Sequence, residues 1–253
     1  MIRSIPYLIR EILTPDGWLE GFLGCPAWQI RSVSELAKLV KDDAAACCAA
    51  FTELTASPVF VYAKAPTDLI EQVTALTGCG FQLIDTNVVF DKPISANEDS
   101  ADRIIIRPAR VEDQQRVGQI AGANFAFSRF HLDPAISNQT ADAIKAAWAE
   151  NFWSGQRGDA MLVAEVDNQV AGFLQLLVRE PEVVVIDLIA VDKTFRNQGV
   201  ATGLIAEAER LYSRCELIRV GTQIANLPSI RCYENTGFRL RSSAYLFHFH
   251  SRL

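Results

Sequence analysis

Residues 186–203 hold the pattern best suited to chemistry. An apolar run that contains Asp187 leads into Arg196-x-x-Gly199-x-Ala201, and further small side chains follow. We expect a buried strand, a turn and a helix whose first turn is built from small residues. Several backbone N–H groups at such a helix start lack intrahelical partners. Together with the positive end of the helix dipole, they predict a site for a pyrophosphate.

Two other phosphate-binding loops do not fit this stretch. A Walker loop needs Lys followed by Ser or Thr after its second Gly, and neither is present. A dinucleotide fingerprint needs G-x-G-x-x-G after the first strand of a parallel unit, and this is absent. An isolated RxxGxA is most simply an ordinary helix start, so the segments around it must decide between the two interpretations.

Those segments resemble the GNAT superfamily of N-acetyltransferases. After the RxxGxA turn come RVGTQIAN at 219–226, an expected helix at 228–235 and then Gly237–Phe238. The resemblance covers residues 103–253. It implies an α+β fold, in which a mixed, mostly antiparallel sheet is flanked by helices. It also implies an enzyme that transfers an acetyl group from acetyl-CoA, as co-substrate, to a primary amine by direct attack.

The resemblance places the pantetheine arm of acetyl-CoA between two diverging strands, 188–191 and 217–224. A bulge near Leu188 or Ile189 would leave an N–H aimed at the thioester oxygen. The residues that it implies for acetyl-CoA binding are Leu188, Ile189, Ala190, Val191, Arg196, Asn197, Gln198, Gly199, Val200, Ala201, Thr202 and Asn226.

Tyr233 matches the family tyrosine that sits beside the thioester sulfur. A phenol has an ordinary pKa of about 10 and a thiol about 8.5, so Tyr233 is protonated at neutral pH and can donate to the departing sulfur. The alternative is that its ring only packs in the core. For the general base, Asp187 and Glu182 lie on the expected strand, but a water relay fits as well, and the favoured interpretation of both is an ordinary solvated or sheet-face charge.

A narrower resemblance concerns the acceptor. The run FAFSRFHLDP at 125–134, together with 220–226 and 242–245, is similar to acetyltransferases of the 4-amino group of nucleotide-linked deoxysugars. It implies a small-molecule amine, a sugar nucleotide, with Arg129 on the diphosphate and His131 or Asp133 on the sugar. Arg129 could instead cover a helix end. Peptide, polyamine and drug amines stay open as acceptors, as does a non-catalytic acyl-CoA sensor, against which Asn226 and Tyr233 count.

The elements that must position these residues follow a regular order. Their expected ranges are strand 104–107, helices 111–127 and 140–152 (Thr140 as N-cap), a hairpin of 161–166 and 170–178 turning at Asp167–Asn168, strand 183–191 started by Pro181, helix 200–213, strand 217–224, helix 228–235 and strand 238–249. This order predicts a mixed sheet with helices on its faces.

In the first part of the chain we expect a smaller α/β domain at 1–95. A polar linker at 93–100 joins it to the catalytic domain expected at 103–253. It ends with a strand at 59–62, a helix at 68–76, Gly80–Phe81 and a strand at 82–90, the plan of the C-terminal segment. Duplication and coincidence both explain this. Leu76 occupies the position that corresponds to Tyr233, and the first part of the chain contains no RxxGxA turn. This degenerate half is expected to bind no acetyl-CoA and to act as scaffold or as one wall of the acceptor site.

Composition limits the partners. The 253 residues are 49% hydrophobic and carry a net charge of -6, which predicts a packed core and argues against nucleic-acid or anionic-membrane partners. None of the six cysteines forms a CxxC pair, as expected of a reduced, cytoplasmic, soluble protein. No signal peptide or membrane span is expected. His131, His248 and His250 show no ligand spacing with the thiols, so no metal site is predicted. A homodimer is compatible with all of this.

Overall fold

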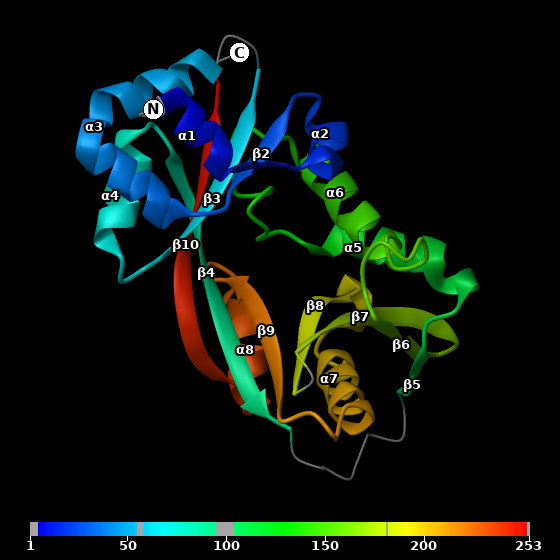
Figure 1. Cartoon of the computed structure of the whole chain (residues 1–253). Coiled ribbons are helices and arrows are strands. Elements are labelled where there is room, and N and C mark those ends of the chain that lie inside the picture. The colour runs from blue at the N-terminus through cyan, green and yellow to red at the C-terminus, as the bar shows by residue number, and fades with distance from the viewer. Residues whose placement is uncertain (1–4, 55–57, 95–103, 181, 252–253) are drawn as a thin grey trace. The chain divides into compact units, whose positions relative to one another are not determined.

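The computed structural model describes residues 5–54, 58–94, 104–180 and 182–251. Most of the predicted linker, and Pro181, lie outside these residues. The fold is α+β, as predicted: ten strands form a mixed sheet in the order β1-β2-β3-β10-β4-β9-β8-β7-β6-β5, with helices beside it (Figure 1). Among the described helices, none combines the length and apolar character needed to span a bilayer.

The chain forms two compact units, and neither is one contiguous stretch. Unit 1 contains residues 1–87, 132–140 and 242–253, and unit 2 contains residues 88–131 and 141–241. The end of the last strand and a short segment after residue 131 therefore pack with N-terminal residues. The functional division into 1–95 and 103–253 stays a prediction.

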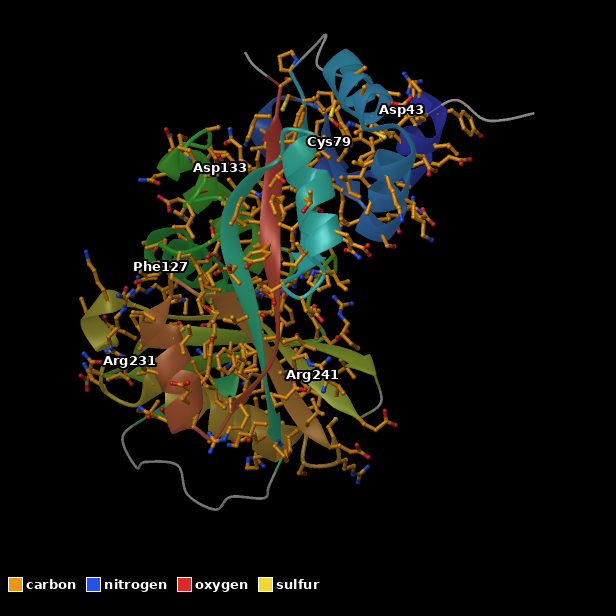
Figure 2. All side chains as sticks on the ribbon, turned by 90° about the vertical axis from the view of Figure 1, so that its left-hand side faces the viewer. Asp43, Cys79, Phe127, Asp133, Arg231 and Arg241 are labelled. Carbon is orange, nitrogen blue, oxygen red and sulfur yellow. The ribbon has the colours of Figure 1, made fainter. Side chains whose placement is uncertain are left out.

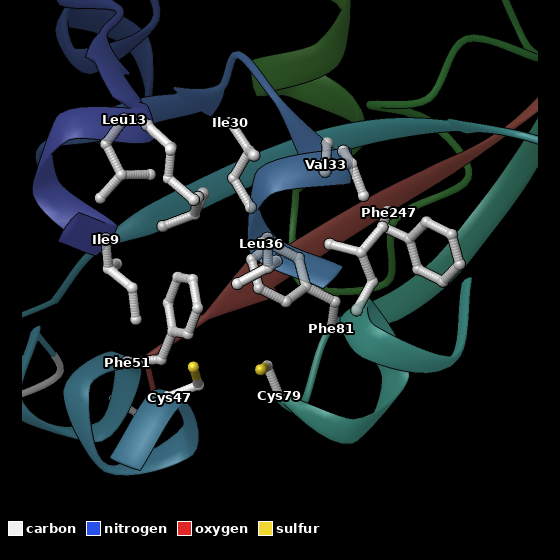
Figure 3. Packing of buried hydrophobic residues seen from close by; sticks show 14 of the residues in the cluster. Ile9, Leu13, Ile30, Val33, Leu36, Cys47, Phe51, Cys79, Phe81 and Phe247 are labelled. Atoms are coloured by element: carbon white, nitrogen blue, oxygen red, sulfur yellow. The ribbon is translucent and has the colours of Figure 1, made fainter. Parts of the chain in front are cut away.

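Unit 1 is a small α/β structure. Its elements are α1 (Ile5–Ile12), β1 (Leu13–Pro15), α2 (Gly17–Leu23), β2 (Ala27–Ile30), α3 (Val33–Leu54), β3 (Phe60–Pro66) and α4 (Ile70–Gly78), with parts of β4 (Gln82–Pro93) and β10 (Arg239–His250). Strand β3 pairs in parallel with β2 and antiparallel with β10. Side chains of helices and strands fill one core, in which Phe51, Phe81 and Phe247 are buried (Figure 3).

The two halves of the chain share a helix-to-strand connection. After α4, Gly80 adopts φ 86°, and the N–H of Phe81 donates to the carbonyl of Leu76 at 3.0 Å. After α8 (Leu227–Asn235), Gly237 adopts φ 93°, and the N–H of Phe238 donates to the carbonyl of Tyr233 at 2.9 Å. The equal geometry favours duplication over coincidence and places Leu76 at the position of Tyr233.

Unit 2 follows the predicted order of elements. Its remaining elements are β5 (Ile105–Pro108), the 3₁₀ helix η1 (Val111–Asp113), α5 (Gln114–Asn124), α6 (Asn138–Glu150), β6 (Ala160–Val166), β7 (Gln169–Glu180), β8 (Val183–Val191), the 3₁₀ helix η2 (Lys193–Phe195), α7 (Val200–Leu211) and β9 (Leu217–Gln223). The predicted hairpin turn is confirmed, because Asp167 and Asn168 both have positive φ, 50° and 60°.

Several predicted helix ends were wrong by two or three residues, such as the ends of α6 at Glu150 and not at 152, and of α7 at Leu211 and not at 213. Helix α5 ends at Asn124 and not at residue 127, because Phe125 is extended at φ -97° and ψ 108°. Helix α6 begins at Asn138, so Thr140 is not its N-cap. The Ser137 hydroxyl instead accepts the N–H of Thr140 at 3.1 Å, the hydrogen bond that an N-cap side chain makes three residues ahead.

Apolar side chains of unit 2 form two clusters. One contains Leu204 and Ala208 of α7 with Leu162 of β6. The other contains Val117 of α5 with Met161 and Val163 of β6. Because neighbouring residues of a strand point to opposite faces of a sheet, these clusters lie on its two sides. Strand β8, which carries the candidate site, has core on both faces.

Candidate active site

The strands β8 and β9 pair over only part of their length. Their parallel ladder joins Val183–Ile186 to Leu217–Val220, and within the described residues it ends there. Strand β8 nevertheless continues to Val191 and β9 to Gln223. Backbone groups beyond the end of a ladder can pair with an extended ligand, as when a peptide adds to a sheet. The resemblance places the pantetheine arm beside this unpaired stretch, and that placement stays a prediction.

A β-bulge sits at the end of this ladder. On the other side of β8, Leu176 pairs with Ile186 and Gln175 with Leu188, so Asp187 has no partner on β7. The bulge therefore falls at Asp187, next to the predicted Leu188. A bulge leaves its extra residue outside the ladder, and this is where the resemblance predicts an N–H for the thioester oxygen.

The bulge also changes which face of the sheet the later side chains of β8 point to. Val184 and Ile186 pack in the cluster of α7, whereas Leu188 and Ala190 pack in the cluster of α5. All four positions are even, so an unbroken strand would point them to one face. The extra residue reverses the alternation. Of the predicted cofactor-binding residues on β8, Leu188 and Ala190 therefore face one side of the sheet, and Ile189 and Val191 face the other.

The start of α7 is open, as a phosphate site requires. Gly199 is the N-cap with φ 84°, and no side chain caps the helix. The first intrahelical bond runs from the N–H of Gly203 to the carbonyl of Gly199 at 2.9 Å, so the preceding N–H groups have no intrahelical partner. Gly199 and Thr202 are exposed, whereas the side chain of Val200 is buried and could offer a ligand only its backbone.

Side chains brace the turn before α7. The Asp192 carboxylate accepts the Thr194 N–H at 2.9 Å and pairs with Arg116 at 2.7 Å. The hydrogen bonds from Thr194, followed by Arg116, lower the pKa of Asp192. The Arg196 guanidinium donates to the Asn124 side chain at 3.0 Å. Asn197 has a positive φ of 62°. The predicted residues Arg196, Asn197 and Gln198 are exposed and lie in this turn.

Asn226 and Tyr233 lie at the start and on the buried face of α8. Asn226 is the N-cap: its oxygen accepts the Ser229 N–H at 3.3 Å, and its amide donates to the Thr222 hydroxyl at 3.2 Å. The Tyr233 ring packs against Phe90 and Phe238, with centroids 6.1 and 5.6 Å away. Burial raises the pKa of Tyr233 well above its ordinary value, so its hydroxyl is protonated at neutral pH.

The three predicted acceptor residues have different surroundings. In unit 2, the Arg129 guanidinium stacks on Phe130 at 4.5 Å from the ring centroid. The His131 ring lies between the Ser128 hydroxyl at 2.6 Å and the Asp142 carboxylate at 2.9 Å. In unit 1, Asp133, which Figure 2 labels, is buried. Each role in acceptor binding stays a prediction.

The buried Asp133 forms a network that the sequence did not reveal. Its Oδ2 is 2.5 Å from Nδ1 of His248 and 2.7 Å from Nε2 of His250, and its Oδ1 accepts the Ala135 N–H at 2.9 Å. Burial alone would raise the pKa of Asp133, but the bonds from both histidines hold it well below its ordinary range. The donor atoms of these three side chains also lie close enough to ligate a metal ion. The hydrogen bonds already satisfy both carboxylate oxygens.

Residues on α6 and in the loop that follows it surround Asp187, and sequence reasoning missed them. Its carboxylate accepts from Nε and Nη2 of Arg157 at 2.6 and 2.5 Å, and from the indole N–H of Trp148 at 2.9 Å. The Lys145 ammonium lies above the same indole at 4.7 Å. The Arg157 guanidinium also stacks on this indole, 4.5 Å from the ring centroid. The spacing of Lys145 and Trp148 on one helix face was the only signal of these contacts in the sequence.

Comparisons with known proteins agree with this geometry. The model of the acetyltransferase (GNAT) family matches residues 124–238. The spore coat polysaccharide biosynthesis protein SpsD of Bacillus subtilis is 32% identical over 143 residues, which cover 56% of this chain and 49% of that protein. The chain thus spans about half the length of this relative. The dTDP-fucosamine acetyltransferase of Escherichia coli O6:H1 is 26% identical over 246 residues, 94% of this chain and 97% of that protein.

A solved structure supports the fold. It is a tandem GNAT protein from the clavulanic acid biosynthesis pathway, with a TM-score of 0.58 at 12% identity, over 91% of this chain and 77% of that one. At this identity the likeness shows the fold alone. The predicted superfamily is confirmed, and the narrower resemblance agrees with the name of a relative that covers nearly the whole chain. Together with the open strand pair and the fold, the family match identifies residues 124–238 as belonging to the acetyltransferase (GNAT) family, whose members typically use an acyl-CoA.

Proposed function

We propose that this chain transfers the acetyl group of acetyl-CoA to the primary amine of a nucleotide-linked amino sugar. The observation that carries the acetyl-CoA part is the early end of the β8–β9 ladder at Ile186 and Val220, beside the bulge at Asp187. The uncapped N-terminus of α7 lies in the same unit. These features offer backbone donors for the pantetheine arm, the thioester oxygen and the pyrophosphate.

The chemistry follows from those positions. A neutral amine attacks the thioester carbon, a C–N bond forms and the C–S bond breaks. The N–H freed by the bulge stabilises the negative charge that develops on the carbonyl oxygen. The amine loses one proton and the sulfur gains one. Tyr233 can donate to the sulfur as it leaves, because its raised pKa keeps the hydroxyl protonated. Water is proposed to take the proton from the amine and to return a proton to Tyr233, since Asp187 is held by Arg157 and Trp148.

Two observations support a sugar nucleotide as the acceptor. One relative is named for acetylating dTDP-fucosamine and another for polysaccharide biosynthesis. In addition, the side chains around Asp187 include Lys145 and Arg157, which favour an anionic acceptor over a cationic polyamine. A peptide or drug amine would gain nothing from this charge.

A panel of amines tests the proposal. Purified protein with acetyl-CoA is given a dTDP-linked amino sugar, the same amino sugar without nucleotide, spermidine and a peptide with a free N-terminus. Thiol release and the mass of the product are measured. We expect turnover on the dTDP-linked sugar above all others. Turnover only on spermidine or the peptide would end the sugar interpretation. Thermal stabilisation by acetyl-CoA without thiol release from any amine would indicate a sensor.

A further inference from the structure

Strand β10 ends with two histidines on one face. His248 and His250 are separated by one residue, and side chains two apart on a strand point to the same side of a sheet. Phe249 between them packs instead against Phe51 and Phe81, with ring centroids 5.9 and 5.2 Å away. The side chain of His248 is fully buried, whereas that of His250 is 27% exposed. The strand therefore presents two neighbouring imidazoles, and solvent can reach one of them.

A carboxylate from a distant part of the chain bridges these two rings. Oδ2 of Asp133 is 2.5 Å from Nδ1 of His248 and 2.7 Å from Nε2 of His250. The three donor atoms all lie within 4.8 Å of one another, and all three residues belong to unit 1. Separate hydrogen bonds do not require their donors to meet at one point. A metal ion does require its ligand atoms to converge in this way.

Neighbouring groups hold each of the three side chains. The buried ring of Phe60 contacts both imidazoles, with ring centroids 4.8 Å from His248 and 5.1 Å from His250. Oδ1 of Asp133 accepts the N–H of Ala135 at 2.9 Å. Hydrogen bonds of this kind orient the carboxylates that ligate metal ions. The ligand atoms are therefore positioned before any ion binds.

The separations of the donor atoms suit a small divalent ion. Zinc bonds to nitrogen and to carboxylate oxygen are about 2.0–2.2 Å long, so ligand atoms in a tetrahedron lie about 3.4 Å apart. Two of the separations here, 2.5 and 2.7 Å, are shorter than this, and the third is at most 4.8 Å. A small shift of the carboxylate and of the half-buried His250 brings all three to the required spacing. Because His250 is partly exposed, water can fill the fourth position.

The types of donor atom select the kind of ion. Ca²⁺ and Mg²⁺ prefer oxygen ligands, whereas two of the three donors here are imidazole nitrogens. Two imidazoles and one carboxylate suit Zn²⁺. The sequence predicts no metal site because the histidines have no ligand spacing with the thiols. The third ligand is instead a carboxylate 115 residues from His248, and no local spacing reveals it.

We propose that Asp133, His248 and His250 bind one zinc ion. The ion takes the place of the hydrogens that lie between the carboxylate and the two rings. It joins the segment 132–140 to the end of β10 within unit 1. Asp133 then serves the structure of unit 1 and does not make the predicted contact with a sugar. The site is independent of the proposed acetyl transfer, whose candidate residues on β8, α7 and α8 belong to unit 2.

Zinc binding to the metal-free full chain tests the site. Calorimetry with Zn²⁺ alone should show one ion bound, with an affinity that falls by at least about 10-fold in Asp133→Asn and in His250→Gln. The matched control is His131→Asn, because His131 contacts the single carboxylate of Asp142 at 2.9 Å. This variant should keep the zinc affinity. Absence of zinc binding, or equal binding by Asp133→Asn and His250→Gln, overturns the proposal.

Two further readouts do not depend on how well the buried Asp133 tolerates substitution. In protein labelled with ¹⁵N-histidine, Zn²⁺ should shift the signals of Nδ1 of His248 and Nε2 of His250 and leave those of His131 unchanged. A shift at His131 alone, or at no ring, contradicts the assignment. Zn²⁺ should also raise the melting temperature of the unmodified protein, because it binds the folded state. An equal rise in His250→Gln would place the ion elsewhere and overturn the proposal.

Discussion

At the scale of single residues, burial decides what Tyr233 and Asp187 can do. Tyr233 packs between aromatic rings, and its raised pKa keeps its hydroxyl protonated. Asp187 sits where the bulge leaves the strand ladder, but Arg157 and Trp148 occupy its oxygens. We infer that Tyr233 is suited to donate and Asp187 to hold Arg157 in position. Packing and catalysis are therefore compatible roles for Tyr233.

Tyr233→Phe separates those roles. Phenylalanine keeps the ring and the contacts with Phe90 and Phe238 but removes the donor. We expect unchanged acetyl-CoA affinity and a fall in kcat of about 100-fold, the usual contribution of a positioned acid. Thiol release under saturating acetyl-CoA measures the rate, and calorimetry measures the affinity. Full turnover in this variant would remove Tyr233 from the mechanism and leave it a packing role.

At the scale of elements, the site depends on how β8 and α7 are interrupted. Strand β8 stops pairing with β9 after Ile186, and its alternation of side chains between the two faces of the sheet is reversed at Asp187. Helix α7 begins at a glycine in the left-handed region with no side-chain cap. Regular elements would satisfy their own backbone groups. We expect these two interruptions to leave backbone donors available, which is what a phosphate and an extended pantetheine arm need.

Gly199→Ala tests the start of α7, and Gly155→Ala is its matched control. Both glycines have positive φ, 84° and 70°, so each alanine should cost about 1 kcal/mol of stability from left-handed strain. A Cβ at either position meets no close neighbour. Only Gly199→Ala should also weaken acetyl-CoA binding, by about 10-fold, as expected when one hydrogen bond to a charged group is weakened.

Thermal unfolding and calorimetry of the two variants check this prediction together. If Gly155→Ala lost acetyl-CoA affinity as much as Gly199→Ala did, the effect would come from general strain. The start of α7 would then have no special part in binding.

At the scale of the whole molecule, the chain repeats one plan with different chemistry. The connections after α4 and α8 share their glycine conformation and hydrogen bonds, yet Leu76 stands where the second has Tyr233. The N-terminal half also lacks an RxxGxA turn. Similar backbones therefore carry an acid-like side chain in one copy and an apolar one in the other. A solved relative of the same fold is itself a tandem GNAT protein.

This difference predicts the number of acetyl-CoA molecules bound. We expect calorimetry to give one acetyl-CoA per chain, and Gly199→Ala to weaken that single event. A second binding event of similar affinity that Gly199→Ala left unchanged would show that the N-terminal half also binds the cofactor. The assignment of that half as scaffold would then be wrong.

Much of the catalytic part could be predicted from sequence because its signals are local. Asp167–Asn168 forms the expected hairpin turn, since both residues tolerate positive φ. Gly199 starts α7, and β8 has its predicted bounds, 183–191. The wrong helix ends were also local matters. Ser137, and not Thr140, makes the N-cap hydrogen bond of α6, and α5 ends where Phe125 is extended. Hydrophobic spacing alone cannot locate such helix boundaries.

The surroundings of Asp187 and Asp133 could not be predicted in this way. Arg157 and Trp148 reach Asp187 across 30 and 39 residues, and His248 reaches Asp133 across 115. No short-range pattern encodes such meetings. They depend on the register of the strands, and one extra residue at a bulge changes which face a side chain occupies.

The order of elements, the open start of α7 and the resemblance to the acetyltransferase family could be predicted from sequence, because turns, caps and apolar periods act over a few neighbouring residues. The end of the β8–β9 ladder, the position of the bulge at Asp187 and the contacts of Lys145, Arg157 and Trp148 became known only from the folded chain. Strand pairing and side-chain burial depend on partners distant in the chain, whose positions exist only once the sheet has formed.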